Sequence, residues 1–549
     1  MKLKTLPFKD GISKGVQVRF GGLNRGLGAG DGELADMKNL TSDHFPLLAS
    51  RAPRVLFKRL WTEPAGARAL GGLFAHEELC WVDGDGFFYG GVFKGSVAPG
   101  EKVISAVADY IVIMPDKVFY NVFLDKFGSM ESVWSGASLT FTHGLLFEEA
   151  AECNTLHAPG VVWSDYFRVG DAVTVAGATL RPGNNKTAVI REISGDKLFF
   201  YEYVFVLDGV DGDVPYTESG ALSVSRLMPD LLYVCENENR LWGCDERTIF
   251  CSALGDIFNF NVFDGLDSDS WAVDVGSPGR FTACVSYMGH PVFFKEDQIY
   301  KVFGTMPSNF ELIASATLGV AEGCSRSLAI AGETLFYLSR AGVVSYSGGI
   351  PRTVGEAFGT ELFRDGVGGS DNLKYYVSMR RADVPDTRHR LFVYDTLRGL
   401  WHVEDELRAA GFALWRGRLY FLNQDGEIWA VRRSENDSTE NVEFPVEWSV
   451  EFADWTDDDP NRKGFSKLQI RLELEPNAFV DIYMMFDSEN FWRKVYGTLN
   501  PSSKRSYYLP ITPRRADHYR LKMEGSGGCL IYSLVRERYS GSENVNNWK

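Results

Sequence analysis

The sequence lacks long hydrophobic runs and closely paired cysteines. No stretch approaches the roughly 18 consecutive apolar residues of a membrane-spanning helix, and the opening MKLKTLPFKDGISKG lacks the apolar core of a signal peptide. The eight cysteines are scattered and never spaced as CxxC, which argues against a zinc site or a disulfide framework. We therefore predict buried free thiols in a protein made in a reducing cytoplasm.

The motifs of several common enzyme classes are also missing. The sequence contains no Walker loop, no GxGxxG after a strand, no HExxH and no GxSxG. Its eight histidines are isolated from one another and lack the spacing of metal ligands. We expect no catalytic residue, no metal and no cofactor, and hence a protein that is not an enzyme.

Basic residues are in deficit. There are 57 Lys and Arg against 73 Asp and Glu, which gives a formal net charge of −16 at pH 7. A protein that grips a phosphate backbone should lean basic, at least on one face. An acidic protein repels that backbone and lets nucleic acid pass without binding it, although solubility alone also explains an acidic balance.

Turn-forming and aromatic residues, in contrast, are plentiful. The chain has 56 Gly and 21 Pro, and aromatic residues occupy 13% of its 549 positions. Many turns combined with aromatic and β-branched residues favour short strands over long helices. Helix is expected only in short pieces such as GELADMKNL (Gly32–Leu40). The sequence predicts an all-β protein of two to four domains.

One unit recurs along the chain: an apolar strand, a tight polar turn and a second strand rich in aromatic or small residues. A single hairpin of this kind cannot bury its own apolar face, whereas stacked four-stranded blades can. We predict a β-propeller of about seven blades, with six or eight left open. The seven hairpins are Leu79–Gly91, Tyr110–Val122, Arg240–Ala253, Pro291–Gly304, Thr334–Gly349, Arg390–Glu404 and Arg418–Val431.

Two further modules accompany the blades. Alternating strands in Tyr166–Phe205 predict a small β-barrel inserted between the second and third hairpins. In LQIRLELE, within Ser466–Pro476, every second residue is apolar, which predicts a C-terminal β-sandwich. The predicted domains are an N-terminal segment with the first blades (1–125), the inserted barrel (126–228), the remaining blades (229–432) and the sandwich (433–549).

Three acidic or turn segments are candidates for chemistry. DGLDSDS (Asp264–Ser270) departs from the calcium-loop pattern and is interpreted as a solvated connecting loop, and DWTDDDPNRKG (Asp454–Gly464) as a hairpin tip. NQDGEIW (Asn423–Trp429) only partly matches the Asp-box turn of sialidases. A glycosidase needs two carboxylates about 5–10 Å apart across a pocket, and sequence alone cannot pair carboxylates between blades.

Three segments carry a resemblance to a known family. GELADMKNLTSDHFPLLASRAPR (Gly32–Arg54) is similar to the opening of certain bacteriophage tail proteins. NRLWGCDERTIFCSALGDIFNFNVF (Asn239–Phe263), leading to His290–Gly304, resembles the propeller core of the tail nozzle (tail tubular B-like, or "stabilization") proteins of short-tailed phages. KLQIRLELE and the segment from Asp517 to Glu543 resemble their C-terminal sandwich.

The resemblance implies a structural virion protein. Members of that family form a ring, usually six-fold, below the head-to-tail adaptor and extend the channel for genome ejection. The expected partners are therefore five further copies in a homohexamer, the adaptor and portal, the host cell envelope at infection, and double-stranded DNA that passes without specific binding. Tail fibres are left open as a further partner, and assembly is expected in the bacterial cytoplasm.

The resemblance supplies no catalytic residue, but two segments are candidates for contact between subunits. Both are glycine-rich or charged turns, which plain exposed loops also resemble. The candidates are Gly21, Asn24, Arg25, Asp31, Glu33, Asp36, Arg181, Asn184 and Lys186. The alternative functions are a glycan-binding or glycan-cleaving propeller, such as a receptor-binding tail component, and a propeller scaffold encoded by a host.

Overall fold

The computed structural model describes residues 12–61, 69–146, 151–201, 203–209, 214–385, 388–435, 437, 440–456, 462–487 and 489–540. The chain forms two compact units: a central unit, Arg68–Glu322, and a terminal unit that combines Met1–Ala67 with Gly323–Lys549. In the described residues the helical turns are the 3₁₀ segments η1 (Trp163–Asp165), η2 (Pro182–Asn184), η3 (Pro307–Asn309), η4 (Ser325–Ser327) and η5 (Glu356–Phe358). None of the helices found there could cross a membrane.

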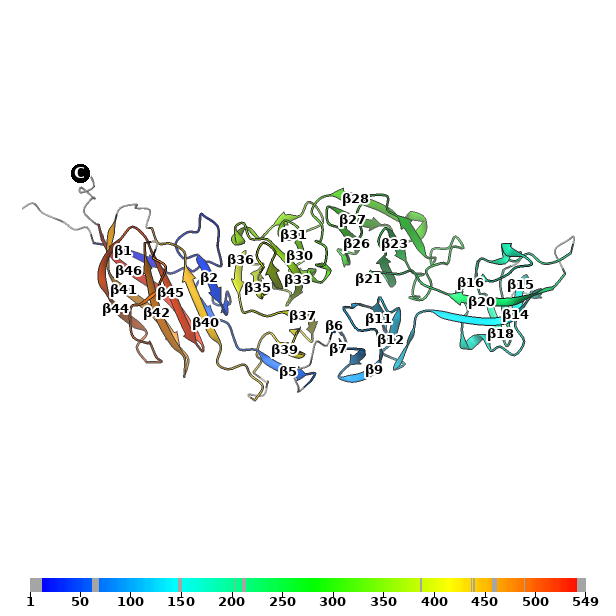
Figure 1. Cartoon of the computed structure of the whole chain (residues 1–549), viewed down its shortest axis with the longest axis horizontal. Coiled ribbons are helices and arrows are strands. Elements are labelled where there is room, and N and C mark those ends of the chain that lie inside the picture. The colour runs from blue at the N-terminus through cyan, green and yellow to red at the C-terminus, as the bar shows by residue number, and fades with distance from the viewer. Residues whose placement is uncertain are drawn as a thin grey trace, which may run out of the picture. The chain divides into compact units, whose positions relative to one another are not determined.

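The central unit contains four antiparallel sheets of four strands each, which we call blades 1 to 4 (Figure 1). Blade 1 consists of β6 (Leu70–His76), β7 (Glu78–Asp83), β8 (Gly86–Tyr89) and β9 (Val92–Ser96). Blade 2 consists of β10 (Val103–Val107), β11 (Tyr110–Met114), β12 (Val118–Asn121) and β13 (Lys126–Ser129). Blade 3 consists of β21 (Tyr233–Asn237), β22 (Arg240–Cys244), β23 (Thr248–Cys251) and β24 (Trp271–Asp274). Blade 4 consists of β25 (Ala283–Tyr287), β26 (His290–Lys295), β27 (Gln298–Phe303) and β28 (Glu311–Ala316).

The inserted barrel lies between blades 2 and 3 in the chain. It is one seven-stranded sheet in the order β17-β16-β20-β14-β15-β19-β18, wrapped around a single core that includes Trp134, Phe141 and Trp163. Among the described residues no ladder joins the outer strands β17 and β18, so the barrel is open there. Its strands are β14 (Ser132–Leu145), β15 (Glu152–His157), β16 (Ala172–Ala176), β17 (Thr187–Val189), β18 (Glu192–Ser194), β19 (Lys197–Phe199) and β20 (Tyr216–Arg226).

The terminal unit holds blades 5 to 7. Blade 5 consists of β29 (Ala329–Ala331), β30 (Thr334–Ser339), β31 (Gly342–Tyr346) and β32 (Arg352–Thr353). Blade 6 consists of β33 (Phe363–Ser370), β34 (Lys374–Arg381), β35 (His389–Asp395) and β36 (Leu400–Val403). Blade 7 consists of β37 (Ala409–Trp415), β38 (Arg418–Asn423), β39 (Glu427–Ala430) and, from the N-terminal segment, β5 (Val55–Arg59).

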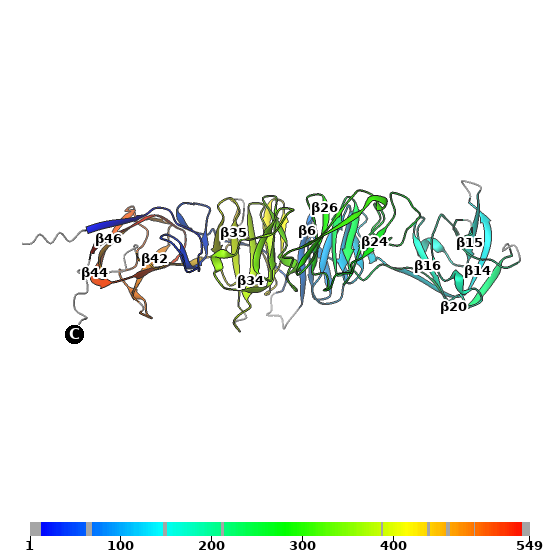
Figure 2. The same cartoon turned by 90° about the horizontal axis from the view of Figure 1, so that it is seen from above.

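The sandwich completes the terminal unit and takes strands from both chain ends, as the mixed colours of its strands show in Figures 1 and 2. One sheet has the order β3-β4-β46-β41-β44, with β1 on β46, and the other has the order β2-β40-β45-β42-β43. The N-terminal strands are β1 (Ile12–Gln17), β2 (Leu34–Lys38), β3 (Leu40–Thr41) and β4 (Leu48–Ser50). The C-terminal strands are β40 (Glu447–Phe452), β41 (Lys463–Leu474), β42 (Phe479–Phe486), β43 (Arg493–Lys494), β44 (Ser506–Ala516), β45 (Tyr519–Ser526) and β46 (Cys529–Ser540).

The cores lie between successive blades, as the repeat of apolar strands predicts. Cys80 and Phe87 of blade 1 share a buried cluster with Ile111 of blade 2. In the terminal unit, Tyr376 of blade 6 shares one with Phe421 of blade 7. Each such side chain that leaves water stabilises the folded state by roughly 1.5–3 kcal/mol. The blades therefore depend on their neighbours for burial.

The predicted architecture is confirmed: the fold is all-β, with seven propeller blades, an inserted barrel and a sandwich. All seven predicted hairpins are adjacent antiparallel strand pairs. Six of them are the second and third strands of their blade, whereas Arg390–Glu404 forms the third and fourth strands of blade 6. The alternation in LQIRLELE is confirmed by Leu468, Ile470 and Leu472, which are buried.

Two predictions about the N-terminal segment are wrong. Gly32–Leu40 is not a helix, because Leu34–Lys38 pairs with β40 and its backbone hydrogen bonds go to that strand. The predicted domain 1–125 does not hold together either, because β1 to β4 belong to the sandwich and β5 to blade 7. The predicted barrel, 126–228, also included β13, which is the outer strand of blade 2. The N-terminal strands were missed because their partners are far away in the chain: β2 pairs with β40, about 400 positions later, and such a pairing leaves no local pattern in the sequence.

Buried ion pairs join the sandwich to the blades within the terminal unit. Arg54 donates to Asp405 at 2.6 Å and to Glu404 at 2.7 Å, and Arg51 donates to Glu443 at 2.7 Å. The side chains of Arg51 and Arg54 are only 4% and 6% exposed, respectively. The pKa of the Asp405 carboxyl lies below its ordinary value, because the effect of Arg54 outweighs burial, which acts in the other direction.

A buried histidine lies in the same region. His402 on β36 lines a small cavity of about 20 Å³ together with Lys374 and Asp43, which are joined by a 2.7 Å ion pair. Burial, assisted by the Lys374 ammonium and by Arg398, lowers the pKa of His402 to about 4, while Asp395 and Asp43 act in the opposite direction. The imidazole is therefore neutral in the folded protein at neutral pH.

This histidine predicts a stability that depends on pH. Between its unfolded pKa of 6.5 and its folded pKa of about 4, the unfolded chain binds a proton that the folded chain does not. Stability should fall as the pH drops through this window, by up to roughly 3 kcal/mol. His402→Gln should lose this component, and His44→Gln, at an exposed position, should keep it. Urea unfolding of the three proteins at pH 7 and pH 4.5 tests this; equal losses in wild type and His402→Gln would contradict it.

Candidate functional site

The inserted barrel is fixed to blade 3 by a buried polar network. Asp171 immediately precedes β16, and its carboxylate is fully buried. It accepts hydrogen bonds from Arg226 Nη1 at 2.5 Å, from Asn259 Nδ2 at 3.0 Å and from the backbone N–H of Arg168 at 2.9 Å. Arg226 ends β20, so the chain returns from the barrel at this point. Asn259 belongs to the loop between β23 and β24 of blade 3.

The amide of Asn259 is satisfied on both sides. Its Oδ1 accepts the backbone N–H of Ala172 at 3.0 Å, and its Nδ2 also donates to Asp256 at 2.6 Å. Removing one of these partners would leave a buried polar group unsatisfied and lower the stability by about 1–3 kcal/mol. The residue therefore fixes the start of β16 against the blade in one register.

An aromatic contact reinforces this network. The Phe258 ring lies under two guanidinium groups, with Arg168 at 4.5 Å and Arg226 at 5.0 Å from its centroid. The ring also makes edge-to-face contacts with Phe119 and Tyr110 of blade 2, at centroid distances of 5.0 and 5.6 Å. A cation over an aromatic face is worth about 0.5–2 kcal/mol. Phe258 thus connects the barrel, blade 2 and blade 3, and we call these contacts, with the Asp171 network, the barrel junction.

The acidic run Asp264–Ser270 lies on the rim of the barrel junction. Asp264 pairs with Arg191 of the barrel at 2.6 Å, and buried Asp269 accepts the backbone N–H of Gly265 at 2.6 Å. Buried Arg240 donates to the carbonyl oxygens of Asp267 and Asp269, each at 2.6 Å. Most of the run is exposed, as the prediction of a connecting loop requires, but its ends are held by these bonds.

The predicted contact residues of the N-terminal segment mainly bind within the terminal unit. Arg25 pairs with Asp36 at 2.6 Å and with Glu361, just before β33 of blade 6, at 2.7 Å. Asn24 Nδ2 donates to Glu33 at 2.8 Å, while Asp31 forms an ion pair with Arg536 of β46, and the Gly21 N–H donates to the Gly32 carbonyl. A glycine is needed at the adjoining Gly22, where a Cβ would lie 2.5 Å from the Trp401 carbonyl oxygen. The segment therefore links the sandwich to blade 6.

The predicted contact residues of the barrel differ in exposure. Asn184 is fully buried, and its Nδ2 donates to the Tyr216 hydroxyl at 2.6 Å, so its side chain serves the barrel itself. Arg181 is about one-third exposed and its Nε donates to Asp208 at 3.0 Å. Lys186 Nζ lies 5.8 Å from the centroid of the Phe205 ring. Contact with another subunit stays a prediction for all nine residues.

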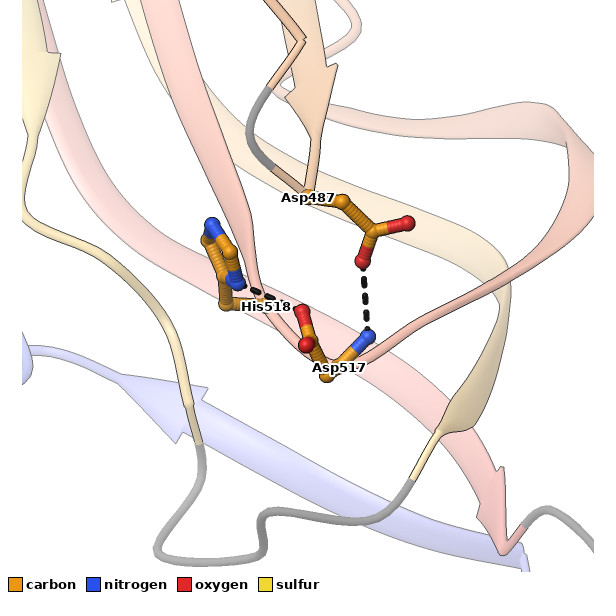
Figure 3. Close-up of side chains that lie close together, drawn as sticks. All are labelled: Asp487, Asp517 and His518. Carbon is orange, nitrogen blue, oxygen red and sulfur yellow. Dashed lines mark hydrogen bonds and ion pairs between the residues drawn. The ribbon is translucent and has the colours of Figure 1, made fainter. Parts of the chain in front are cut away.

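One cluster in the sandwich has the composition of a metal site. Asp487, Asp517 and His518 place one potential ligand atom each within 4.8 Å of one another (Figure 3). The Asp517 backbone N–H donates to Asp487 Oδ1 at 2.9 Å, and His518 Nδ1 lies 2.5 Å from Asp517 Oδ1. Hydrogen bonds with Asp487 and His518 hold the pKa of the Asp517 carboxyl below its ordinary value. Asp517 and His518 lie in the turn between β44 and β45, Asp487 directly follows β42, and Asp517 hydrogen-bonds both of the others.

Burial and ion pairs shift the pKa values of several described groups. Seven cysteines are buried and Cys284 is half-buried, and all are free thiols, which confirms the prediction of buried free thiols. Burial raises the pKa of Cys251 to about 12, so its reactive thiolate is scarce. Among the described carboxyl groups with a shifted pKa, Glu451 is raised, by burial, and the others are lowered. A raised pKa is typical of a general acid, but Glu451 pairs with Arg520 at 3.4 Å, and this contact acts against the effect of burial on the pKa.

Two further segments were candidates for chemistry from their sequence. In NQDGEIW, Asn423 Oδ1 accepts the N–H groups of Asp425 and Glu427, which closes the tight turn between β38 and β39. The predicted hairpin tip Asp454–Gly464 lies partly outside the described residues, which omit 457–461. The anchoring residues Asp171, Arg226 and Asn259 were not predicted from the sequence. Their one signal is that Asn259 lies in DIFNF, within the segment that carries the family resemblance.

Comparison with known proteins leaves the family open. No protein-family model and no curated protein matches the sequence. Among solved structures, BamB from Moraxella catarrhalis is 9% identical and covers 70% of this chain and 98% of its own, with a TM-score of 0.26. An exo-β-1,3-galactanase from Phanerochaete chrysosporium is 8% identical over 54% of this chain and 92% of its own, with a TM-score of 0.21. These likenesses are loose, and the fold assignment depends on the chain's own sheets.

The barrel junction predicts unequal effects for two carboxylates. Asp171→Asn should destabilise the central unit by roughly 3–5 kcal/mol, because it leaves the buried Arg226 guanidinium without its counter-charge. Asp264→Asn, which removes a partly exposed ion pair, should cost at most about 1 kcal/mol. Urea unfolding gives the free energies, and hydrogen exchange should show faster opening of β16 in Asp171→Asn alone. Equal effects of the two substitutions would contradict the role assigned to Asp171.

Proposed function

We propose that the protein is a structural component of a bacteriophage particle, a tail nozzle subunit that forms a ring below the head-to-tail adaptor. The proposal depends mainly on one observation: the segment that carries the family resemblance is also the segment that holds the inserted barrel. The segment that resembles the nozzle propeller core, Asn239–Phe263, contains Asp256, Phe258 and Asn259, which hold the inserted barrel on the blades. The residues that carry the resemblance therefore also hold the inserted barrel, a module that a propeller of blades alone lacks.

The construction of the two units supports a mechanical role. A ring that guides DNA must keep its parts in fixed positions while neighbouring subunits and the adaptor bear on them. Buried ion pairs do this well, because displacing one partner leaves an uncompensated charge in the interior. Asp171 with Arg226, and Arg54 with Asp405 and Glu404, are contacts of this kind.

The proposed partners follow from the ring. Further copies of the chain, six in all, would surround the channel, and the adaptor and portal would lie above them. The net charge of −16 supports a channel that DNA crosses without adhering, since like charges repel. The barrel, fixed by the barrel junction, would be the module that meets neighbours or the adaptor.

Electron microscopy of the purified chain mixed with the portal–adaptor complex from the same genome tests this function. The proposal predicts six-fold rings on that complex, because the chain would add one layer to an existing channel. Asp171→Asn should form fewer rings, since its barrel is no longer fixed, and Asp264→Asn should behave as wild type.

The alternative function predicts a different result. A glycan-binding or glycan-cleaving propeller would remain a monomer or trimer beside the portal–adaptor complex and would bind or cleave oligosaccharides. That outcome would overturn the nozzle assignment.

A further inference from the structure

A pocket of about 330 Å³ opens at blade 6, beside the N-terminal segment of the terminal unit. Arginines from three parts of the chain converge on it, together with two carboxylates. We call it the arginine pocket. Its charged lining consists of Arg25, Arg381, Arg388, Arg390, Asp36 and Glu361.

The floor of the arginine pocket is apolar. Phe363, Met379 and Phe392 line it and are almost fully buried. Strand register explains why the charges stand beside this floor: Met379 on β34 lies opposite Arg390 on β35, and Phe363 on β33 lies opposite Arg381 on β34. Directly opposed residues of an antiparallel pair point to the same face of the sheet. The pocket therefore combines guanidinium groups with an aromatic and aliphatic base.

The two carboxylates inside the arginine pocket are outnumbered by four guanidinium groups. Asp36 lies between Arg25 at 2.6 Å and Arg390 at 3.1 Å, and Glu361 lies between Arg25 at 2.7 Å and Arg381 at 3.1 Å. Burial raises the pKa of the Asp36 carboxyl, but Arg390 and Arg25 outweigh burial and hold it below its ordinary value. The field at this point therefore favours negative charge.

Two further carboxylates pair with these arginines from outside. Asp383 binds Arg381 at 2.6 Å and Glu406 lies 3.3 Å from Arg388, and their side chains are 40% and 55% exposed. Charges at such exposed positions are screened by water and salt. Arg388 is itself 65% exposed, so it can exchange Glu406 for an incoming carboxylate at little cost.

We infer that the arginine pocket receives an acidic segment with an apolar side chain from a second copy of this chain. A guanidinium group binds a carboxylate through two parallel hydrogen bonds, and the apolar floor would hold an aliphatic or aromatic neighbour. The charge complementarity is local: the four arginines of the pocket would face acidic side chains on the surface of a second copy. Its surface offers such a segment: Phe123 and Leu124 are 82% and 62% exposed, beside Asp125, whose side chain is 66% exposed.

This inference rests on the proposed ring and gives it a contact. An interface that joins copies head to tail needs a pocket on one face and a complementary segment on another. Arg25 and Asp36, which the sequence predicts as contact residues, line the arginine pocket. The pocket therefore supplies a receiving side for such an interface.

Charge reversal at the exposed rim tests the inference. Arg388→Glu should raise the concentration needed for ring formation on the portal–adaptor complex at least tenfold, because it places a like charge against the incoming carboxylate. Arg352→Glu is the matched control, since Arg352 on β32 is also exposed and does not line the pocket. Mass photometry across a concentration series gives the association, and urea unfolding confirms that both variants fold.

The outcomes separate this inference from the proposed function. Rings of Arg388→Glu that form as readily as those of wild type would overturn the inference and leave the nozzle assignment intact. A wild-type chain that forms no rings at all would overturn both. Calorimetry with a uronic-acid oligosaccharide and with inorganic phosphate covers other anions; tight binding of either, lost in Arg388→Glu, would show that the pocket serves a small ligand and would overturn a second copy as its occupant.

Discussion

The central unit depends on one buried contact, in which Asp171 meets Arg226 and Asn259. The chain enters the inserted barrel on β14 and leaves it on β20, and two strands alone would let a module swing about its connections. The buried carboxylate permits one arrangement, because any other would leave Asp171 or Arg226 in the interior without a partner. Phe258 extends this constraint to blade 2. The position of the barrel is therefore encoded in side chains of blade 3 as well as in its own strands.

In the terminal unit, N-terminal strands that join distant sheets and buried ion pairs fix the parts against one another. β5 completes blade 7, and β1 to β4 complete the sandwich, so the first described residues hold together elements from the last third of the chain. Arg51 and Arg54 lie between β4 of the sandwich and β5 of blade 7. Arg51 binds Glu443, and Arg54 binds both Glu404 and Asp405. Backbone pairing fixes direction and register, and the ion pairs fix the sandwich against blade 6.

The sequence was sufficient for the blades because their signal is local. Each hairpin carries its own alternation and its own turn, so all seven were found, and LQIRLELE likewise revealed its buried face. It was insufficient where distant segments pair. Gly32–Leu40 has the composition of a short helix, but within it Leu34–Lys38 forms a strand because it pairs with β40. The barrel junction was missed for a related reason: Asp171 and Asn259 lie 88 positions apart, and neither has an unusual local pattern.

Three features support the proposed mechanical role: the barrel is fixed by buried contacts, the sandwich takes strands from both ends of the chain, and buried ion pairs join the sandwich to the blades. Under the proposed function the chain is a fixed part of a virus particle, and its charged surfaces contact neighbouring proteins. Cryo-electron microscopy of the intact phage particle tests the claim most directly. The account predicts that the propeller, barrel and sandwich fit density in a ring that surrounds the DNA channel below the adaptor; density for them at the tips of receptor-binding fibres instead would contradict it.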